Sequence, residues 1–175
     1  PWSAKGYRVL LVAEYDGVPE QRGLSPQRVS PMALVLLSNR VRAAAPKTFQ
    51  YFAEQGVHVK VISGDNPITV SEVARQAGIP GAEHYVDAAA LKSDGDLERA
   101  PVKYTVFGRV TPGQKRKLVR ALQKAGHTVA MTGDGVNDVL ALKDADCGIA
   151  LASGAEAACH AAQLVLLNSD FSAMP

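Results

Sequence analysis

Residues 131–138, which read Met-Thr-Gly-Asp-Gly-Val-Asn-Asp, decide the fold of this 175-residue chain. An apolar strand over residues 128–131 is predicted to run into the Gly-Asp-Gly turn, and a helix is predicted to follow. Carboxylate and amide oxygens therefore gather at the carboxyl end of a strand, which is where an open parallel sheet binds ligands. Mg²⁺ prefers such oxygens, together with substrate phosphates and water. We expect Asp134 to be a Mg²⁺ ligand, with an aspartate that only caps the turn as the alternative.

Two further motifs lie upstream of this stretch. Residues 61–67 read Val-Ile-Ser-Gly-Asp-Asn-Pro, so the hydroxyl of Ser63 and the backbone N–H of Gly64 stand at a strand end where they can hold phosphoryl oxygens. Residues 111–115 read Thr-Pro-Gly-Gln-Lys, and Lys115 is the candidate for neutralising the charge of a phosphoryl group. Alone, the first motif would more often be a structural turn and the second a solvated helix face. In combination with residues 131–138, the two motifs are far more specific than either is alone.

Together with residues 132–151, these motifs resemble the P-type cation-transporting ATPases, a branch of the haloacid-dehalogenase-like phosphotransferases. The order and spacing of the motifs agree with that family over residues 31–172. The resemblance implies three catalytic residues. Lys115 would stabilise charge on the transferring phosphoryl group, Asn137 would contact that group, and Asp138 would assist beside the metal. Asp138 is also a second candidate Mg²⁺ ligand, with capping of the following helix as the alternative.

The resemblance also assigns residues to the nucleotide, with ATP as the substrate and Mg²⁺ as the cofactor. Asp65 would belong to the nucleotide and Mg²⁺ region together with Ser63 and Gly64. Residues 39–42 read Asn-Arg-Val-Arg, and Arg42 would contact a nucleotide phosphate. Asn39 stands where the family usually has Asp, which removes one charge from that position.

The family's phosphorylated aspartate lies in the sequence Asp-Lys-Thr-Gly-Thr, which does not occur in this chain. The expected fold is therefore α/β, a doubly wound parallel sheet of the haloacid-dehalogenase type that lacks the strand carrying this aspartate. Residues 1–31 would be the end of a nucleotide-binding domain with its connection, and residues 32–175 the C-terminal part of a phosphorylation domain. By itself the chain is not expected to form the phosphoenzyme.

Apolar strands alternate with amphipathic helices along the chain. Strands are predicted over residues 7–13, 33–37, 57–62, 104–107, 128–131, 148–151 and 164–167, with the second of these buried. Helices are predicted over residues 44–55, 67–77 and 112–125, after Asn137, and near residues 155–162, with connections over residues 15–31 and 85–94.

The absent central strand predicts a slot between the strands that lead to Ser63 and Asp134. Leaving its backbone groups unpaired would cost on the order of 1–3 kcal/mol for each buried group, so we expect a strand to fill or close the slot. Residues 7–13 are one candidate. A strand from another chain, or a separate fragment of the same protein, is favoured over them.

Composition narrows the function classes. The net charge is +2 with scattered basic residues, which does not indicate nucleic acid as a partner. No apolar run approaches the ~20 residues that cross a bilayer. Cys147 and Cys159 lack metal-ligand spacing and are expected to be reduced buried thiols. The resemblance places the chain on the cytoplasmic side of the cell membrane, with the remainder of the same polypeptide as its partner, including nucleotide-binding and actuator domains and membrane helices. Residues 52–70 look closest to actinobacterial E-type pumps, for which calcium is the suggested transported cation.

Two other classes stay open. A soluble haloacid-dehalogenase-type phosphatase would share the Ser, Lys and Asp motifs, but it needs its own nucleophilic aspartate, and Asp16 and Asp87 lack the required surrounding sequence. A non-catalytic module that binds Mg²⁺ and nucleotide would keep the fold without the chemistry. Activity on small phosphomonoesters would favour the phosphatase.

Overall fold

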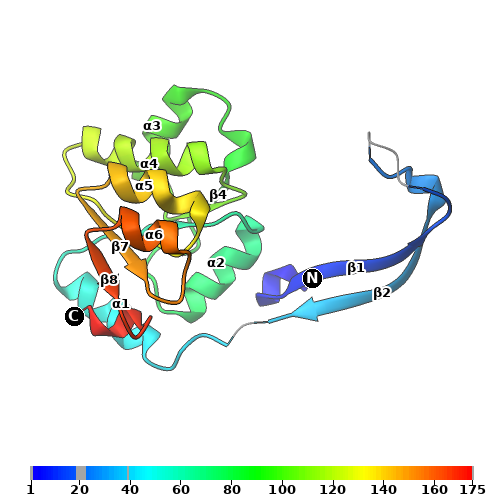
Figure 1. Ribbon diagram of the computed structural model, residues 1–175, viewed down its shortest axis with the longest axis horizontal. Helices are drawn as coiled ribbons and strands as arrows, with labels where there is room; N and C mark the ends of the chain where they lie inside the picture. The colour runs from blue at the N-terminus through cyan, green and yellow to red at the C-terminus, as the bar shows by residue number, and fades with distance from the viewer. Residues whose placement is uncertain (1, 19–22, 39, 175) are drawn as a thin grey trace.

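A computed structural model describes residues 2–18, 23–38 and 40–174, and it divides them into a layered α/β body and a hairpin that extends away from it (Figure 1). Asn39 lies outside the described residues. In chain order, the strands are β1 (Arg8–Tyr15), β2 (Val29–Leu37), β3 (Val61–Ile62), β4 (Tyr85–Asp87), β5 (Val106–Gly108), β6 (Ala130–Gly133), β7 (Cys147–Leu151) and β8 (Leu164–Leu166). The α-helices are α1 (Ala45–Glu54), α2 (Pro67–Gln76), α3 (Asp94–Lys103), α4 (Pro112–Lys124), α5 (Val139–Asp144) and α6 (Glu156–Ala161). Short 3₁₀ helices are η1 (Ser3–Lys5), η2 (Pro26–Arg28), η3 (Ala88–Ala90), η4 (Val136–Asp138) and η5 (Phe171–Ala173).

The body contains two parallel sheets instead of one. Their strand orders are β3-β5-β4 and β6-β7-β8, so β3 and β6 are both edge strands. Across the described residues no ladder joins β3 to β6. The parallel α/β fold is confirmed, and the break lies where the absent central strand was predicted.

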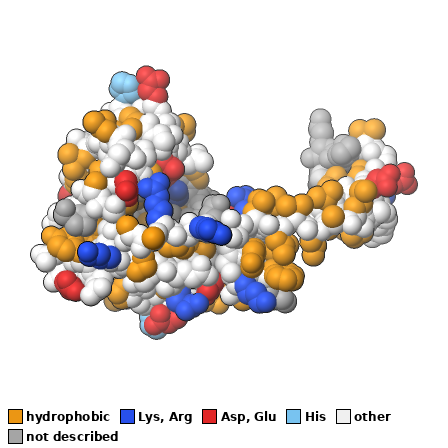
Figure 2. Space-filling model, turned by 90° about the horizontal axis from the view of Figure 1, so that it is seen from below, with side chains coloured by type: hydrophobic (Ala, Val, Ile, Leu, Met, Phe, Trp, Pro, Cys, Tyr) orange, Lys and Arg blue, Asp and Glu red, His pale blue; other side chains and the backbone are white. Residues whose placement is uncertain are grey.

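The strands β1 and β2 form an antiparallel hairpin in register from Arg8 opposite Leu37 to Tyr15 opposite Val29. The suggestion that residues 7–13 fill the slot is therefore wrong, because the backbone groups of β1 pair with β2. The prediction that residues 33–37 are buried is also wrong. Leu34 is 58% exposed, and hydrophobic side chains follow one another along the hairpin (Figure 2). The division after residue 31 stays a prediction, although it falls inside β2.

Helix ends follow the capping residues that the sequence offers. The side chain of Asn66 accepts a hydrogen bond from the N–H of Ile68 at 3.0 Å and begins α2, with Pro67 in the first turn. Gly78 follows this helix with φ +79°, a left-handed conformation that glycine adopts without strain. The predicted helices over residues 67–77 and 112–125 are confirmed to within one residue at each end.

The segment over residues 85–94 was predicted to be a connection, and this is wrong. It contains β4 and η3 and leads into α3, which Ser93 starts with a capping box to Asp96. A three-residue strand offers too short a pattern to recognise, and Pro101 inside α3 hides the helical pattern.

The core is divided like the sheets, and α4 joins its parts. Val119 belongs to a cluster with Met131, Leu142 and Ala150 around β6 and β7, and it is 1% exposed. Its neighbour Leu118, also 1% exposed, belongs to a second cluster beside β4, β5 and α3. Successive residues of one helix thus pack against both sheets, so α4 holds the body together across the break.

The C-terminal segment docks on α1. The ring of Phe171 lies 5.7 Å from that of Phe49 and 5.5 Å from that of Phe52, measured between centroids. Beside this cluster, Arg42 and Asp170 approach to 3.4 Å. Among the described residues, no helix has the length and apolar character needed to cross a membrane.

Candidate functional site

The centre of the candidate site is an ion pair between Lys115 and Asp138. The Nζ atom of Lys115 donates to Oδ1 of Asp138 at 2.5 Å, and the two side chains are 14% and 8% exposed. Lys115 lies in the first turn of α4, just after β5, and Asp138 ends η4, just after β6. The ion pair therefore joins the carboxyl ends of the two sheets, where a parallel sheet places its ligands.

Asp138 also shapes the loop in front of it. Its second carboxylate oxygen accepts a hydrogen bond from the N–H of Gly135 at 3.1 Å. A side chain at Gly133 would bring its Cβ to 2.6 Å from the Cβ of Asp138, so the close approach requires glycine there. Both oxygens of Asp138 are engaged, one with the lysine and one with the loop. The predicted capping of the following helix is wrong, because Asp138 stands at the N-cap of α5 without a side-chain hydrogen bond to it, while its role as a metal ligand stays a prediction.

Asp134 lies on the exposed side of the same loop. Its backbone carbonyl accepts from the N–H of Ala155 at 2.7 Å, and a Cβ at Gly154 would lie 2.5 Å from that carbonyl oxygen. The turn after β7 therefore holds the backbone of Asp134 closely. Asn137, also exposed, follows in η4.

The oxygen ligands at this site suit a Mg²⁺ ion that takes few of its ligands from the protein. Within the part of the chain that the structure describes, no three carboxylate, imidazole or thiol side chains gather in a group able to hold a metal ion. One carboxylate with water and phosphoryl oxygens is, however, a common Mg²⁺ environment. Asp134 fits that description, because Asp138 already has two protein partners.

The Ser63 turn is clasped by the loop between β5 and α4. The hydroxyl of Ser63 accepts from the N–H of Asp65 at 3.1 Å. The N–H of Val110 donates to the carbonyl of Ser63 at 3.0 Å, and that of Arg109 donates to the carbonyl of Asp65 at 2.8 Å. Arg109 has φ +53°, a left-handed conformation that costs a residue with a side chain of order 1–3 kcal/mol. The turn is thus fixed by the segment that leads to Lys115.

A shallow pocket of about 250 Å³ opens beside this turn, between the base of the hairpin and α2. The carboxylate of Asp65 lies 3.6 Å from Arg8, and both side chains are more than half exposed, so the pair contributes little to stability. The pocket is lined by Ser3, Arg8, Val9, Gly64, Asp65, Asn66, Thr69 and Arg109.

Arg42 lies with the C-terminal segment. Its guanidinium donates to the carbonyl of Ser169 at 3.3 Å and approaches Asp170 to 3.4 Å. The structure thus brings together Lys115, Asp138 and the loop of Asp134, and it gives Arg42 a different neighbourhood. The predicted contact of Arg42 with a nucleotide phosphate stays a prediction.

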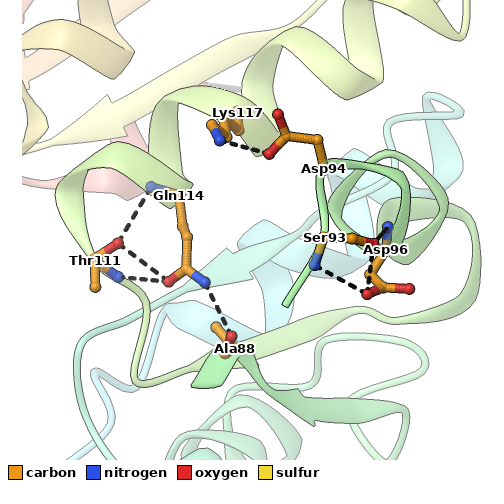
Figure 3. Close-up of polar contacts among 7 residues, drawn as sticks. All are labelled: Ala88, Ser93, Asp94, Asp96, Thr111, Gln114 and Lys117. Atoms are coloured by element: carbon orange, nitrogen blue, oxygen red, sulfur yellow. Dashed lines mark hydrogen bonds and ion pairs between the residues drawn. The ribbon is translucent and has the colours of Figure 1, made fainter. Parts of the chain in front are cut away.

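Three residues that support the site were not predicted. Arg109 forms an ion pair with Asp87 at 2.6 Å, and Gln114 donates to the carbonyl of Ala88 at 2.9 Å. Figure 3 shows Gln114 reaching from α4 toward Ala88. For Gln114, a signal was present in the sequence, because a threonine followed three residues later by glutamine is a capping box. Asp87 gave no signal, since its pairing depends on a strand that was not recognised.

Residues 4–146 match the family model described as haloacid dehalogenase-like hydrolase. The chain belongs to this family. Nearly the whole chain also matches cation-transporting ATPases in sequence. It is 53% identical over 174 residues to the calcium-transporting ATPase CtpE of Mycobacterium bovis, matching 98% of this chain and 21% of that protein.

More distant relatives of this haloacid dehalogenase-like chain are also transport ATPases by name. It is 43% identical to the probable cation-transporting ATPase Exp7 of Streptococcus pneumoniae, over 98% of this chain and 22% of that protein. It is 35% identical to the magnesium-transporting ATPase, P-type 1, of Salmonella typhimurium, over 97% of this chain and 19% of that protein. The chain thus spans about one-fifth of the length of these relatives. The predicted resemblance to P-type cation pumps is confirmed.

A solved structure shares the fold. The catalytic domain of the CPx-ATPase CopB-B superposes with a TM-score of 0.61 over 86% of this chain and 49% of that chain, at 19% sequence identity. At this identity the likeness concerns the fold alone.

Proposed function

We propose that this chain is part of the catalytic headpiece of an ATP-driven cation pump, where it supplies the Mg²⁺ and phosphoryl-binding residues for an aspartyl-phosphate cycle. The observation that carries the proposal is the Lys115–Asp138 pair at the break between the sheets. The Lys115 side chain, which is 14% exposed, follows β5, and the loop with the exposed Asp134 follows β6, at the carboxyl ends of two sheets whose edge strands β3 and β6 are not paired with each other. An aspartate delivered on the absent strand would meet both.

The chemistry asked of these residues is electrostatic. Phosphoryl transfer needs positioning and compensation of charge on the equatorial oxygens more than covalent help from the protein. A bound Mg²⁺, held by Asp134 and phosphoryl oxygens, would supply part of that charge. Lys115 would share its ammonium between Asp138 and the phosphoryl group, and Asn137 would offer its amide. Ser63 and Gly64 would bind phosphoryl oxygens from the other sheet.

The phosphatase alternative is less favoured, because its candidate nucleophiles lie elsewhere. Asp16 follows β1 in the hairpin, where its N–H donates to the backbone carbonyl of Arg28. Asp87 ends β4, the strand of its sheet farthest from the break, and is paired with Arg109. Neither carboxylate is placed beside Lys115. When the missing strand is supplied, a pump headpiece should become phosphorylated and a non-catalytic module should not.

The proposal extends to the surroundings of the chain. The partner is the remainder of the same polypeptide, with nucleotide-binding and actuator domains and membrane helices, and the location is the cytoplasmic side of the membrane. The proposed division after residue 31 leaves β1 at the end of the nucleotide-binding domain, and β2, which pairs with β1, crosses from one domain to the other. Calcium is the proposed transported cation, since CtpE, the relative at 53% identity, is named a calcium-transporting ATPase.

Titration of the chain with Mg²⁺ tests the metal assignment. We expect weak binding in isothermal titration calorimetry, because water must complete the coordination, and we expect Asp134→Ala to abolish it. Asp94→Ala is the matched control, since Asp94 is an exposed carboxylate on α3. Equal binding by the Asp134 variant would refute the assignment.

Incubation with γ-labelled ATP tests the catalytic half of the proposal. The chain alone is expected to hydrolyse ATP no faster than a blank, and the pump that contains it should form an acid-stable, hydroxylamine-sensitive phosphoenzyme. In the pump, Lys115→Ala should abolish that labelling. Labelling of the chain alone would mean that it carries its own nucleophile.

A further inference from the structure

Gln114 connects the first turn of α4 to a segment that the sequence did not identify. Its side-chain Nε2 donates to the carbonyl of Ala88 at 2.9 Å, across 26 residues of sequence. Its Oε1 accepts from the N–H and the hydroxyl of Thr111, each at 3.1 Å (Figure 3). A single amide thus caps α4 and ties it to η3.

The acceptor of the hydrogen bond from Gln114 belongs to a buried residue. Ala88 is 0% exposed and packs in the cluster of Leu97, Phe107 and Leu118. The carbonyl of Ala88 also accepts a hydrogen bond from the N–H of Leu91 at 3.2 Å, so it keeps one partner when the amide of Gln114 is removed. What the bond from Gln114 adds is a direct connection between the first turn of α4 and η3, at 2.9 Å.

The chemistry of residue 114 separates two tasks. A glutamate would complete the capping box as well as glutamine, since only an acceptor is needed. Only the amide also has a donor for Ala88. The next residue is Lys115, whose ammonium reaches Asp138 at 2.5 Å. The donor that ties α4 to η3 therefore sits one residue before the lysine of the candidate site.

A second contact near the start of α4 runs to α5. Arg116 is paired with Asp144 of α5. Lys115 thus lies between two residues that anchor α4, Gln114 bonded to η3 and Arg116 paired with α5. The same helix packs against both sheets. Removing the η3 bond leaves the lysine held from one side.

We propose that Gln114 is a positioning residue for Lys115, acting through the carbonyl of Ala88. The role of Gln114 in catalysis rests on the proposed function, in which Lys115 stabilises phosphoryl charge. Its role in holding Lys115 beside Asp138 does not depend on that function.

The test compares Gln114→Glu with Gln123→Ala in the full-length polypeptide. Gln123 is the matched control, because its amide donates to the backbone carbonyl of Asp144 at 2.9 Å from the same helix, two turns after Lys115. The rate at which an amine-acylating reagent modifies Lys115 is followed by peptide mass spectrometry, relative to Lys143. Lys60, half-buried and bonded to the carbonyl of Tyr104 at 2.9 Å, reports whether the core is intact.

We expect Lys115 to react roughly three- to tenfold faster in Gln114→Glu, the change that loss of one net hydrogen bond allows. Its rate should be unchanged in Gln123→Ala, and the rate at Lys60 should be unchanged in both. In the pump, Gln114→Glu should also slow phosphoenzyme formation at saturating ATP while the KM for ATP stays the same.

Three outcomes would overturn the inference: a wild-type rate at Lys115 in Gln114→Glu, an equal rise in Gln123→Ala, or a parallel rise at Lys60. Failure of the proposed function appears elsewhere, as normal phosphorylation of the pump carrying Lys115→Ala. That result would leave the acylation rates, and the positioning they report, unaffected.

Discussion

At the scale of single residues, the Lys115–Asp138 pair shows what a sequence motif leaves undetermined. Each residue was predicted from its own motif, but 23 residues separate them, and no spacing rule states that they touch. The contact depends on how α4 and η4 end up at adjoining strand ends. Gln114 and Arg109 are similar, because their partners lie in η3 and at the end of β4, two three-residue elements too short to predict.

Asp138→Ala is expected to destabilise the chain strongly. It leaves the ammonium of Lys115, which is 14% exposed, without its partner, and loss of one member of a buried pair costs about 3 kcal/mol. Urea denaturation measures the difference. Adding Lys115→Met to the variant should recover a large part of the loss. Lys117→Met is the control, because Lys117 and Asp94 are 53% and 77% exposed and their pair should contribute about 0–1 kcal/mol.

Gly133→Ala should break the same site from the loop side. The added Cβ would lie 2.6 Å from that of Asp138, so the backbone or the carboxylate must shift, at a cost of about 1–3 kcal/mol. Gly113→Ala, in the first turn of α4, meets no atom within 4 Å and should be neutral or slightly stabilising. Thermal unfolding of the two variants distinguishes them. Equal midpoints would mean that the loop can move aside.

At the scale of elements, prediction succeeded where local chemistry sets the ends. The helices α2 and α4 each combine a capping residue, a proline in the first turn and a glycine beyond the end. It failed for β2, whose apolar run was predicted to be buried in the body. An apolar pattern indicates that a strand is suited to packing against another surface. It does not indicate whether that surface belongs to the same chain.

The link between α4 and α5 is expected to make stability depend on acid pH. The hydrogen bond from Arg116, together with that from Arg120, holds the pKa of Asp144 below its usual value. In acid the unfolded chain then binds the proton more readily, so this contribution is present above about pH 4 and is lost as the pH falls through the folded-state pKa.

Asp144→Asn should therefore unfold at lower urea than the parent chain at pH 7, and the difference should shrink toward pH 3. Glu98→Gln is the control, because Glu98 and its partner Lys124 are 50% and 72% exposed. A difference that stays constant with pH would show that the charge of Asp144 does not stabilise the folded chain.

At the scale of the whole molecule, the hairpin presents apolar side chains without cover. Leu11 stands opposite Leu34 in the register, and the two are 55% and 58% exposed. Apolar surface of this kind on a strand pair invites contact with another protein surface. The isolated chain is therefore expected to self-associate as its concentration rises.

Leu11→Glu combined with Leu34→Glu should reduce this association in sedimentation velocity while the urea midpoint of the body is unchanged. Val102→Glu is the matched control, because Val102 is 82% exposed on α3, outside the hairpin. If the control reduces association equally, the hairpin is not the surface responsible.

The base of the hairpin is attached at two points, and this makes it a lever. On the β1 side, the hydroxyl of Thr69 donates to the carbonyl of Tyr7 at 3.4 Å, and Arg8 lies 3.6 Å from Asp65. On the β2 side, the chain continues into α1. Two attachments define an axis of rotation, and a strand of nine residues makes an arm of about 30 Å. A turn of roughly 10° about that axis would carry the tip about 5 Å. Thr69 lies in the first turn of α2, which begins just after the turn of Ser63, so a load on the tip would act next to that turn.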